Sequence, residues 1–507
     1  MIATALAALL LAPLRPQVEQ YRQANEARIV GELADFVSIP NLASDAPNIA
    51  RNAQRLVEML ARRGVVARLL EDPQSPPVVY GELRSPGARR TLVLYAHYDG
   101  QPVDPAQWKT PPWSPVLRDA RGQELPLPDA GGGGGDLPAE ARLYGRSASD
   151  DKAPIVAMLT ALDALRAANL TPSVNLKFFF EGEEEAESKR LPAHLARNRD
   201  LLASDGWIFC DGPVHQSRRM QVVYGARGVV TLDLTVYGPT RALHDGHYGN
   251  WAPNPAARLA ALLASMRDPE GKVLIAGFSD GARPIGAAER AAIAQIPNVD
   301  DELRKSLGLA RTEAANAPLP QRILLPALNI RGLQAGHVGE QAANAIPTEA
   351  QASIDLRLVP DQKLDSVKQA VERHIAAQGY AIVRDEPDAS TRLSQARIVR
   401  VRWGGGYPGV RIPLDAPLSR AVAAVVAEAM GDAPIVHLPI LGGSVPLATI
   451  RDALGAPIVI LPIVNHDNNQ HAANENLRLQ NLWDGVQIFA ALFTRVGSVW
   501  EQRGANR

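Results

Sequence analysis

A histidine and an aspartate follow an apolar, β-branched segment of the chain at the point where a strand would end. Residues 91–95 read Thr-Leu-Val-Leu-Tyr, and His97 and Asp99 come shortly after them. Buried strands of α/β sheets have this composition, and such sheets place their ligands beyond the carboxyl ends of the strands. Side chains two positions apart on an extended chain share one face. The spacing therefore predicts that His97 and Asp99 contribute to one site.

Acidic residues follow two further strand-like segments. The run NLKFFF leads into Glu184 and Glu185, and the run GWIFC leads into Asp211. An acidic run is more often a solvated helix start, but the apolar strand in front of this one places its acids at a strand end. Because parallel strands deliver their carboxyl ends to one edge of a sheet, we expect these acids to lie near His97.

Histidine and carboxylate ligands without thiolates are the set expected for zinc, cobalt or manganese in a hydrolytic site. The single cysteine, Cys210, excludes an internal disulfide and a cysteine-rich metal site. Asp150, in the turn SDDK, and His471, in QHAANENL, are two further candidate ligands. Two metal ions need more negative charge than one, and a bridging carboxylate is the usual solution.

Charge and length exclude several classes of partner. The 53 basic and 54 acidic residues give a formal net charge of -1, which argues against nucleic acid or an acidic membrane surface as the main partner. Beyond the N-terminus no segment approaches the ~20 apolar residues that cross a bilayer, so no membrane span is expected. At 507 residues the chain is too long for one core, and two or more domains are expected.

The first 16 residues, MIATALAALLLAPLRP, contain an apolar stretch of signal-peptide length, but no Lys or Arg precedes it. A cleaved export signal would make the protein periplasmic or secreted, and otherwise it would be cytoplasmic. The alternatives to a signal are a helical N-terminal extension and a misassigned start codon.

Strand-like and helix-like segments alternate along the chain, which predicts an α/β fold with a mainly parallel sheet flanked by helices. Residues 226–388 differ in style and are expected to form a smaller inserted α/β domain. The sheet domain would then be discontinuous, with residues 17–225 as its first part and 389–507 as its second. Five consecutive glycines at 131–135 favour a flexible surface insertion over a phosphate loop, because no Gly-Lys-Ser/Thr follows them.

The order of the motifs resembles that of a known family. The chain carries, in sequence, AHYDGQPVD, YGRSASDDKAPI, FFFEGEEEAES, FCDG, LHDGHYGN, IDLRLVP, GGSVP and QHAANENL. This series is similar to that of the di-zinc metallopeptidases and amidohydrolases, which include carnosinases, non-specific dipeptidases, aminoacylases, carboxypeptidase G and succinyl-diaminopimelate desuccinylase. The motifs HYDGQPVDP and GGSVP favour the carnosinase-like dipeptidase branch.

The resemblance implies a set of metal ligands and a fold. One metal ion would be bound by His97 and Asp211. The second would be bound by Glu185 and His471, and Asp150 would bridge the two ions, most simply zinc, with manganese or cobalt as alternatives. The inserted domain would act as a lid and would join two copies of the chain in a homodimer.

The resemblance also implies three catalytic roles. Asp99 would hydrogen-bond the second ring nitrogen of His97 and fix the orientation of the imidazole. Glu184 would be the general base that removes a proton from the attacking water. His244, in LHDGHYGN, would reach across a dimer interface, contact the substrate and stabilise the oxyanion.

Three further positions match substrate-binding residues of the family. Arg357 would offer a planar fork to a substrate carboxylate, and Gly443 and Ser444 would lie near the same end of the substrate. The implied reaction is the hydrolysis of dipeptides or short peptides with a free C-terminal carboxylate. The alternatives are an N-acyl amino acid deacylase and a catalytically inactive binding protein, although an inactive protein should have lost ligands that this chain keeps.

Two positions depart from the family pattern. Relatives commonly have glycine where this chain has Glu187. If that position takes a positive φ, Glu187 costs on the order of 1 kcal/mol and adds a charge near the metals. Relatives also have glycine where this chain has Ala153. Neither change removes a ligand, so both are interpreted as changes of specificity or loop shape.

Overall fold

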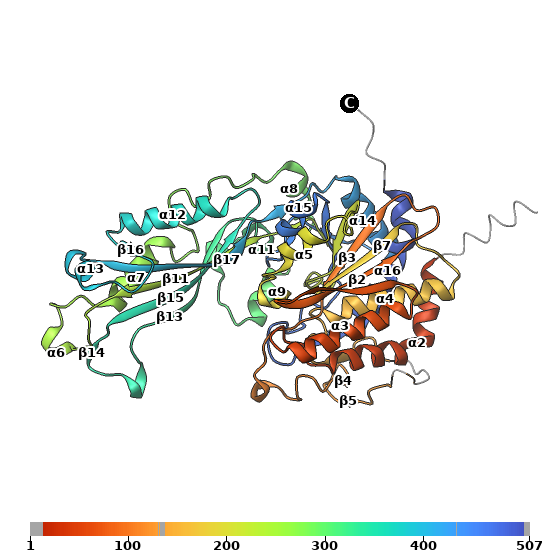
Figure 1. Cartoon of the computed structure of the whole chain (residues 1–507), viewed down its shortest axis with the longest axis horizontal. Coiled ribbons are helices and arrows are strands. Elements are labelled where there is room, and N and C mark those ends of the chain that lie inside the picture. Colours follow the sequence, from red (N-terminus) through yellow and green to blue (C-terminus); the bar gives the residue numbers. More distant parts are fainter. Residues whose placement is uncertain (1–13, 130, 132–136, 432, 501–507) are drawn as a thin grey trace, which may run out of the picture. The chain divides into compact units, whose positions relative to one another are not determined.

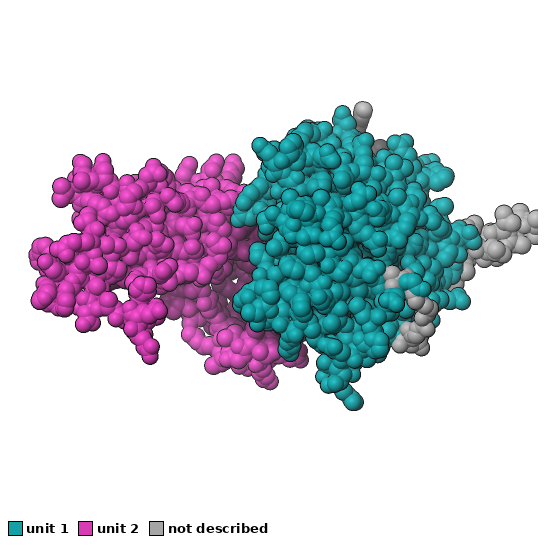
Figure 2. Space-filling view, turned by 60° about the horizontal axis from the view of Figure 1, so that its bottom comes forward, with its two compact units in different colours: residues 1–224, 412–438, 449–507 teal, residues 225–411, 439–448 magenta. Residues whose placement is uncertain are grey.

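The computed structural model describes residues 14–129, 131, 137–431 and 433–500, so the expected signal segment up to residue 13 and the glycines at 132–135 lie outside the described residues. The chain divides into two compact units, which Figure 2 colours separately. Unit 1 comprises residues 1–224, 412–438 and 449–507, and unit 2 comprises residues 225–411 and 439–448. Each unit has a hydrophobic core of its own.

Unit 1 is built on an eight-stranded sheet. In spatial order its strands are β1 (Val66–Asp72), β2 (Ser75–Leu83), β7 (Asn175–Glu181), β3 (Thr91–His97), β8 (Gly206–Phe209), β20 (Ile458–Ile460), β9 (Gln221–Val223) and β19 (Val436–Leu438). Strands β7, β3, β8 and β20 form a parallel group. The strands on either side of this group, β2 and β9, are antiparallel to β7 and β20, respectively. The expected α/β class with a mainly parallel sheet is confirmed.

Strand β3 lies in the middle of this sheet because it is apolar on both faces. Every residue of β3 after Thr91 is buried. The ring of Tyr95 stacks on that of Phe209 in β8, with 3.9 Å between the ring centroids. The hydroxyl of Tyr95 donates a hydrogen bond of 2.6 Å to Glu181, at the end of β7. These contacts hold the ends of three neighbouring strands together just before the chain reaches the candidate site residues.

Helices flank the sheet of unit 1 (Figure 1). The longer ones are α2 (Leu14–Val37), α3 (Ala46–Ala61), α4 (Lys152–Ala167), α14 (Pro417–Ala429) and α16 (Leu479–Val499), and the shorter ones are α5 (Leu191–Arg197) and α15 (Leu447–Leu454). Helix α4 packs between α2 and α16 and is buried on nearly every side, which matches its apolar sequence. Among the described residues, none of the helices is both long and apolar enough to cross a membrane.

A second, four-stranded sheet of unit 1 brings two distant loops together. Its order is β21 (Asn476–Arg478), β6 (Arg142–Tyr144), β4 (Val116–Arg118) and β5 (Glu124–Leu125), and each neighbouring pair is antiparallel. Strand β6 leads into the turn that carries Asp150, and β21 follows the loop that carries His471. The pairing of β6 with β21 therefore places these two segments side by side.

Unit 2 is a smaller α/β unit with a five-stranded sheet. The order of its strands is β13 (Ala327–Gln334), β15 (Glu349–Leu358), β11 (Gly228–Tyr237), β17 (Ile398–Tyr407) and β16 (Ala381–Val383). Helix α7 (Pro255–Met266) packs on β11 and β15, and α12 (Leu364–Ala377) packs on β16. The unit continues past residue 388 to Arg411, because β17 pairs along most of β11 and completes the sheet.

Shorter elements complete the two units. They are η2 (Pro105–Gln107) and η3 (Glu184–Ala186) in unit 1, and β10 (Gly225–Ala226), β12 (Leu243–His244), α6 (Asp245–Tyr248), α8 (Ala287–Ala294), α9 (Asp300–Ser306), α10 (Glu313–Asn316), α11 (Leu319–Arg322), η4 (Gly339–Gln341), β14 (Ala345–Ile346), α13 (Ala389–Ser394) and β18 (Val410–Arg411) in unit 2.

A buried ionic cluster joins three helices of unit 1. Arg63, just after α3, contacts Glu32 of α2 and Asp163 of α4, each at 2.7 Å. The side chains of Arg63 and Glu32 are only 5% and 6% exposed. Burial acts to raise the pKa of Glu32, but the hydrogen bonds and charge of Arg63 outweigh it and hold that pKa below its ordinary value. The contribution of the pair is therefore present above the unfolded-state pKa of Glu32 and is lost as pH falls through its folded-state pKa.

Replacing Arg63 with Met should destabilise unit 1 by about 3 kcal/mol at neutral pH, because Glu32 would stay buried without its main partner. Urea unfolding of both proteins measures the difference, which should shrink in acid as Glu32 becomes protonated. Arg84→Met is the matched control, since Arg84 is 84% exposed in its pair with Glu82. That change should cost less than about 0.5 kcal/mol. Equal effects of the two substitutions would contradict the role of the buried cluster.

Candidate metal centre

The carboxyl ends of three neighbouring strands of unit 1 supply side chains to one region. His97 is the last residue of β3, Glu184 and Glu185 begin η3 after β7, and Asp211 follows β8. Strand β3 pairs in parallel with both β7 and β8, so the three ends lie at the same edge of the sheet. Asp150 joins them from the turn before α4.

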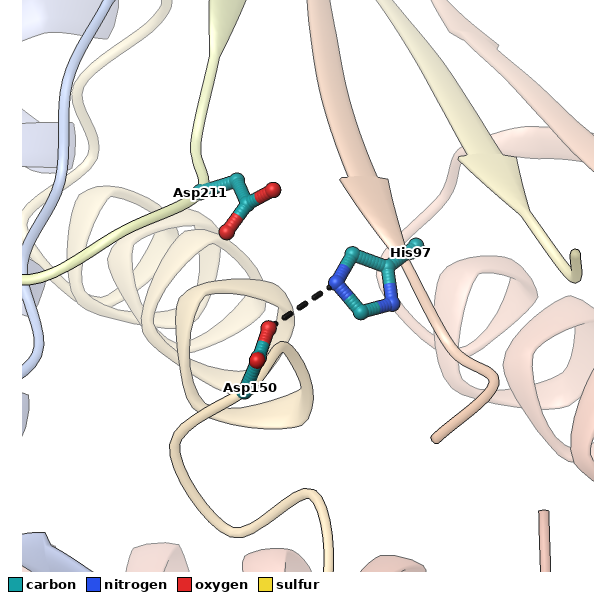
Figure 3. Close-up of side chains that lie close together, drawn as sticks. All are labelled: His97, Asp150 and Asp211. Atoms are coloured by element: carbon teal, nitrogen blue, oxygen red, sulfur yellow. Dashed lines mark hydrogen bonds and ion pairs between the residues drawn. The ribbon is translucent and has the colours of Figure 1, made fainter. Parts of the chain in front are cut away.

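His97, Asp150 and Asp211 form one group that could hold a metal ion. One nitrogen or oxygen atom from each lies within 4.8 Å of the others, and all three side chains are buried. Nε2 of His97 is 3.0 Å from Oδ1 of Asp150. Figure 3 shows the imidazole and the two carboxylates around a common space.

Asp150, Glu185 and His471 form a second such group, with the same 4.8 Å limit between their ligand atoms. Nε2 of His471 is 3.2 Å from Oδ2 of Asp150 and 3.4 Å from Oε2 of Glu185. Asp150 thus uses one carboxylate oxygen toward each group. This is the geometry that a carboxylate bridging two metal ions requires.

Asp99 lies behind His97 and the glutamate pair and contacts both. Nδ1 of His97 is hydrogen-bonded to the backbone carbonyl of Asp99 at 3.2 Å and lies 3.4 Å from Oδ1 of the same residue, whereas Nε2 of the ring faces Asp150. The two carboxylate oxygens of Asp99 also accept hydrogen bonds from the backbone N–H groups of Glu184 and Glu185, at 3.1 and 3.0 Å. Asp99 therefore orients a candidate metal ligand and the candidate base together, through its backbone carbonyl and its carboxylate.

Several carboxyl groups lie close together in this buried region, and their pKa values are raised. Burial first, and the charge of Asp150 second, raise the pKa of Glu185 to about 8 and that of Asp211 to about 6. Burial likewise raises the pKa of Glu184 well above its usual range. The positive charge of divalent cations would offset the repulsion among these carboxylates and favour their ionised forms. The donor set therefore fits two such ions.

The pKa of Asp150 is lowered, whereas the pKa values of the neighbouring Glu185 and Asp211 are raised. Burial acts to raise its pKa, but the hydrogen bonds with His471 and His97 outweigh burial and hold the pKa below its usual range. Asp150 is therefore ionised at neutral pH, as a bridging ligand must be.

The turn that carries Asp150 is held by a buried glutamate that the sequence did not indicate. Oε1 of Glu475 accepts hydrogen bonds from the N–H of Asp150 at 2.9 Å and from the N–H and hydroxyl of Ser149, both at 3.0 Å. Oε2 accepts from the N–H of Ser147 at 3.0 Å and from Nη1 of Arg146 at 2.7 Å. Every partner is a donor, which favours the ionised acceptor form of Glu475, whereas burial acts the other way and raises its pKa.

Glu475 also ends the loop that carries His471. In that loop His471, Asn469 and Asn474 all have positive φ angles, near +60°, which L-residues adopt at a cost. The loop is followed at once by β21, whose pairing with β6 fixes its end. Glu475 therefore connects the backbone segments of two candidate ligands. The available signal was its place in the motif QHAANENL, which does not indicate burial or partners.

Two glutamine side chains contact the candidate ligands and were likewise not indicated. Nε2 of Gln101 donates to Oε2 of Glu185 at 2.6 Å. Nε2 of Gln470 donates more weakly to Oδ2 of Asp150, at 3.4 Å. Gln101 belongs to the motif AHYDGQPVD and Gln470 to QHAANENL, so sequence position alone could have suggested them.

The two departures from the family pattern have different local settings. Glu187 has a φ of +75°, the left-handed conformation in which a non-glycine residue costs about 1–2 kcal/mol. Its side chain is 62% exposed and lies 3.9 Å from Lys189, so the charge faces solvent rather than the buried carboxylates. Ala153 is fully buried in the first turn of α4.

The candidate substrate residues belong to unit 2. Nη1 of Arg357 donates to Oγ of Ser444 at 2.7 Å, and Nε of Arg357 pairs with Asp355 at 2.6 Å. Oγ of Ser444 in turn donates to the carbonyl of Gly228 at 3.2 Å, and Gly443 precedes it. The structure thus brings Arg357, Gly443 and Ser444 together.

His244 lies elsewhere on unit 2, in the short pair formed by β12 and β14. Its side chain is 56% exposed, and its Nδ1 accepts a hydrogen bond of 3.1 Å from the N–H of Gly246. The ring of His247 lies 4.6 Å away, measured between centroids. Nε2, the other nitrogen of the His244 ring, takes no part in this backbone contact.

The chain is similar to known proteins both in sequence and in structure. The profile described as Peptidase family M20/M25/M40 matches residues 93–495. The Cys-Gly metallodipeptidase dug1 of Schizosaccharomyces pombe is 23% identical, over 93% of this chain and 96% of the relative. The Beta-Ala-His dipeptidase of Homo sapiens is 28% identical, over 89% of this chain and 84% of the relative. An M20 family metallo-carboxypeptidase from Sulfolobus solfataricus has a similar structure, with a TM-score of 0.76 and 26% identity over 92% of this chain and 98% of that chain.

Replacing Glu475 with Gln should weaken metal binding about 10- to 100-fold, because the turn that orients Asp150 would lose the charge that holds it. Calorimetric titration of chelated protein with zinc or manganese measures the affinity. Ser149→Ala, which removes one of the donors, should weaken binding less and in the same direction.

Glu428→Gln is the control for this change. Glu428 is half-exposed and pairs with Arg495 away from the candidate ligands, so metal affinity should not change. Unaltered metal affinity in a folded Glu475→Gln variant would rule out the positioning role.

Proposed function

The chain belongs to peptidase family M20/M25/M40, and we propose that it hydrolyses dipeptides or short peptides with a free C-terminal carboxylate by means of two divalent metal ions. The observation that carries this proposal is the pair of ligand groups that share Asp150 at the edge of a parallel sheet. The two relatives named above are dipeptidases, which supports peptides over N-acyl amino acids as substrates. An inactive binding protein would have no use for a complete set of ligands.

The proposed ligands follow from the geometry of the two groups. His97 and Asp211 would hold one ion, Glu185 and His471 the other, and Asp150 both. Nitrogen and oxygen donors of this kind suit zinc, and we propose zinc, with manganese and cobalt accepted by the same donors. When bound, the ions would lower the pKa of a water molecule and polarise the scissile carbonyl.

Glu184 is the proposed general base. Its backbone N–H donates a hydrogen bond to Asp99, and the charges of His97 and Asp211 act on the pKa of its carboxyl group. A carboxylate whose pKa is raised above its usual range accepts a proton more readily at neutral pH. Glu184 would take the proton of the attacking water and pass it to the leaving amine.

His244 and a homodimer complete the proposal. The exposed position of His244 on unit 2 suits a residue that acts on the substrate of a second subunit. The outer strand β13 supports dimer formation, because it is an edge strand with exposed apolar side chains at Ile330 and Leu333. In this arrangement the imidazole would donate a hydrogen bond to the developing oxyanion.

Chelated protein should be inactive toward dipeptides, and zinc, manganese or cobalt should restore hydrolysis. The assay compares a panel of dipeptides with the corresponding N-acetyl amino acids, and dipeptides should be the better substrates. Activity that survives complete removal of the metals, or a preference for the acyl compounds, would contradict the proposed reaction.

Glu184→Gln should lower kcat by at least about 100-fold while the metal content stays at the wild-type value, because the amide cannot accept the proton. Elemental analysis and dipeptide assays measure the two quantities. Glu187→Gln is the matched control in the same segment, and its exposed side chain predicts nearly unchanged kcat. A Glu184→Gln enzyme with wild-type kcat would require a different base.

His244→Ala should lower kcat about 100-fold without changing metal content, as the loss of one oxyanion donor does. His247→Ala, on the neighbouring exposed ring, is the control. Mixing the His244→Ala and Glu184→Gln proteins under subunit exchange should restore up to about a quarter of the wild-type activity, because half of the dimers would be mixed and each would have one complete site. A mixture as inactive as its components would exclude action across the dimer.

A further inference from the structure

A second arginine of unit 2 lies beside the segment that carries Ser444. Arg227 stands between β10 and β11, and its Nε donates to the carbonyl of Gly442 at 2.8 Å. Its backbone N–H donates to the carbonyl of Leu441 at 3.2 Å. A Cβ at residue 442 would lie 3.3 Å from Cγ2 of Ile323 and 3.7 Å from Nη2 of Arg227. Arg227 is thus held against residues 441 and 442 by both its side chain and its backbone.

Arg227 and Arg357 therefore flank the same short segment. Arg357 lies on β15 opposite Val229 of β11 and reaches Ser444, while the residue after Arg227, Gly228, accepts the hydroxyl of Ser444. Burial first, and the charge of Arg357 second, lower the pKa of Arg227 to about 10. The positive charges of the two guanidinium groups thus act against each other, and the single acid Asp355 offsets part of this effect.

The charges around this segment do not balance. Arg357 is paired with Asp355, at 2.6 Å. Within the described part of the chain, the Nη atoms of Arg227 have no hydrogen-bond or ion-pair partner, and neither has Nη2 of Arg357. These nitrogens are not among the buried atoms that lack a partner, so they keep some contact with solvent. One positive charge and several donors are therefore available to an anion that approaches Gly442–Ser444.

We propose that Arg227 is a second binding residue for the C-terminal carboxylate of the substrate and supplies the charge that selects a free acid. This inference rests on the proposed function of the same protein. Arg357, whose charge is compensated by Asp355, would contribute planar hydrogen bonds and orientation. Arg227 would contribute the uncompensated charge, and a bound carboxylate would relieve the repulsion between the two guanidinium groups.

The test compares two forms of one dipeptide, the free acid and the C-terminal amide, in the metal-loaded dimeric enzyme. Arg227→Gln should raise KM for the acid at least about 10-fold, as the loss of a hydrogen-bonded charge does. KM for the amide, kcat for both forms and the metal content should stay close to wild type. Arg227→Lys keeps the charge without the planar fork and should give an intermediate KM for the acid.

Arg402→Gln is the control, because Arg402 is an exposed arginine of the same unit on β17. It should leave the ratio of the acid and amide KM values unchanged. Calorimetric binding of a free amino acid and of its amide provides a second readout without turnover, and Arg227→Gln should weaken only the binding of the acid.

The possible outcomes separate this inference from the proposed function. If the wild-type enzyme cleaves dipeptides and Arg227→Gln keeps the wild-type ratio of acid to amide, the role of Arg227 is wrong and the proposed function stands. If the wild type cleaves no dipeptide, both fail. If Arg227→Gln does not fold, the Lys variant decides, and an unchanged acid-to-amide ratio in that variant overturns the inference.

Discussion

The repulsion among buried carboxylates around Asp150 is the constraint on which the architecture of unit 1 depends. Glu184, Glu185 and Asp211 come from two different strand ends, and burial raises the pKa of each. Such a cluster cannot be held by its own contacts, because its members repel one another. Rigid elements must therefore bring the acids together, and the parallel strands β7, β3 and β8 do so.

Two further carboxylates hold the parts of the cluster in place by accepting hydrogen bonds from its backbone. Asp99 accepts the N–H groups of the two glutamates, and Glu475 accepts those of the turn around Asp150. Both anchors are acidic, so they fix backbone without placing a competing cation among the ligands. Residues in the left-handed region, such as His471 and Glu187, lie in the loops next to these anchored segments. The strain is stored where the site is built and is balanced by the surrounding hydrogen bonds.

Part of this could be predicted from the sequence and part could not. The strands that lead to His97, Glu184 and Asp211 were predictable because an apolar run followed by polar residues is a local pattern. The role of Glu475 was not, because most of its partners are backbone groups that no side-chain pattern encodes. The extent of unit 2 beyond residue 388 was not predictable either, since β17 belongs there through non-local pairing with β11.

The candidate site residues of the two units carry charges of opposite sign. The carboxylates of unit 1 attract metal ions but would repel a substrate carboxylate, so recognition of a free C-terminus requires cations from another part of the chain. Arg357 alone does not supply that charge, because Asp355 already compensates it. The uncompensated guanidinium of Arg227 does. The proposed metal ligands lie in unit 1 and both arginines lie in unit 2, so metal binding and selection of the substrate carboxylate can be altered separately.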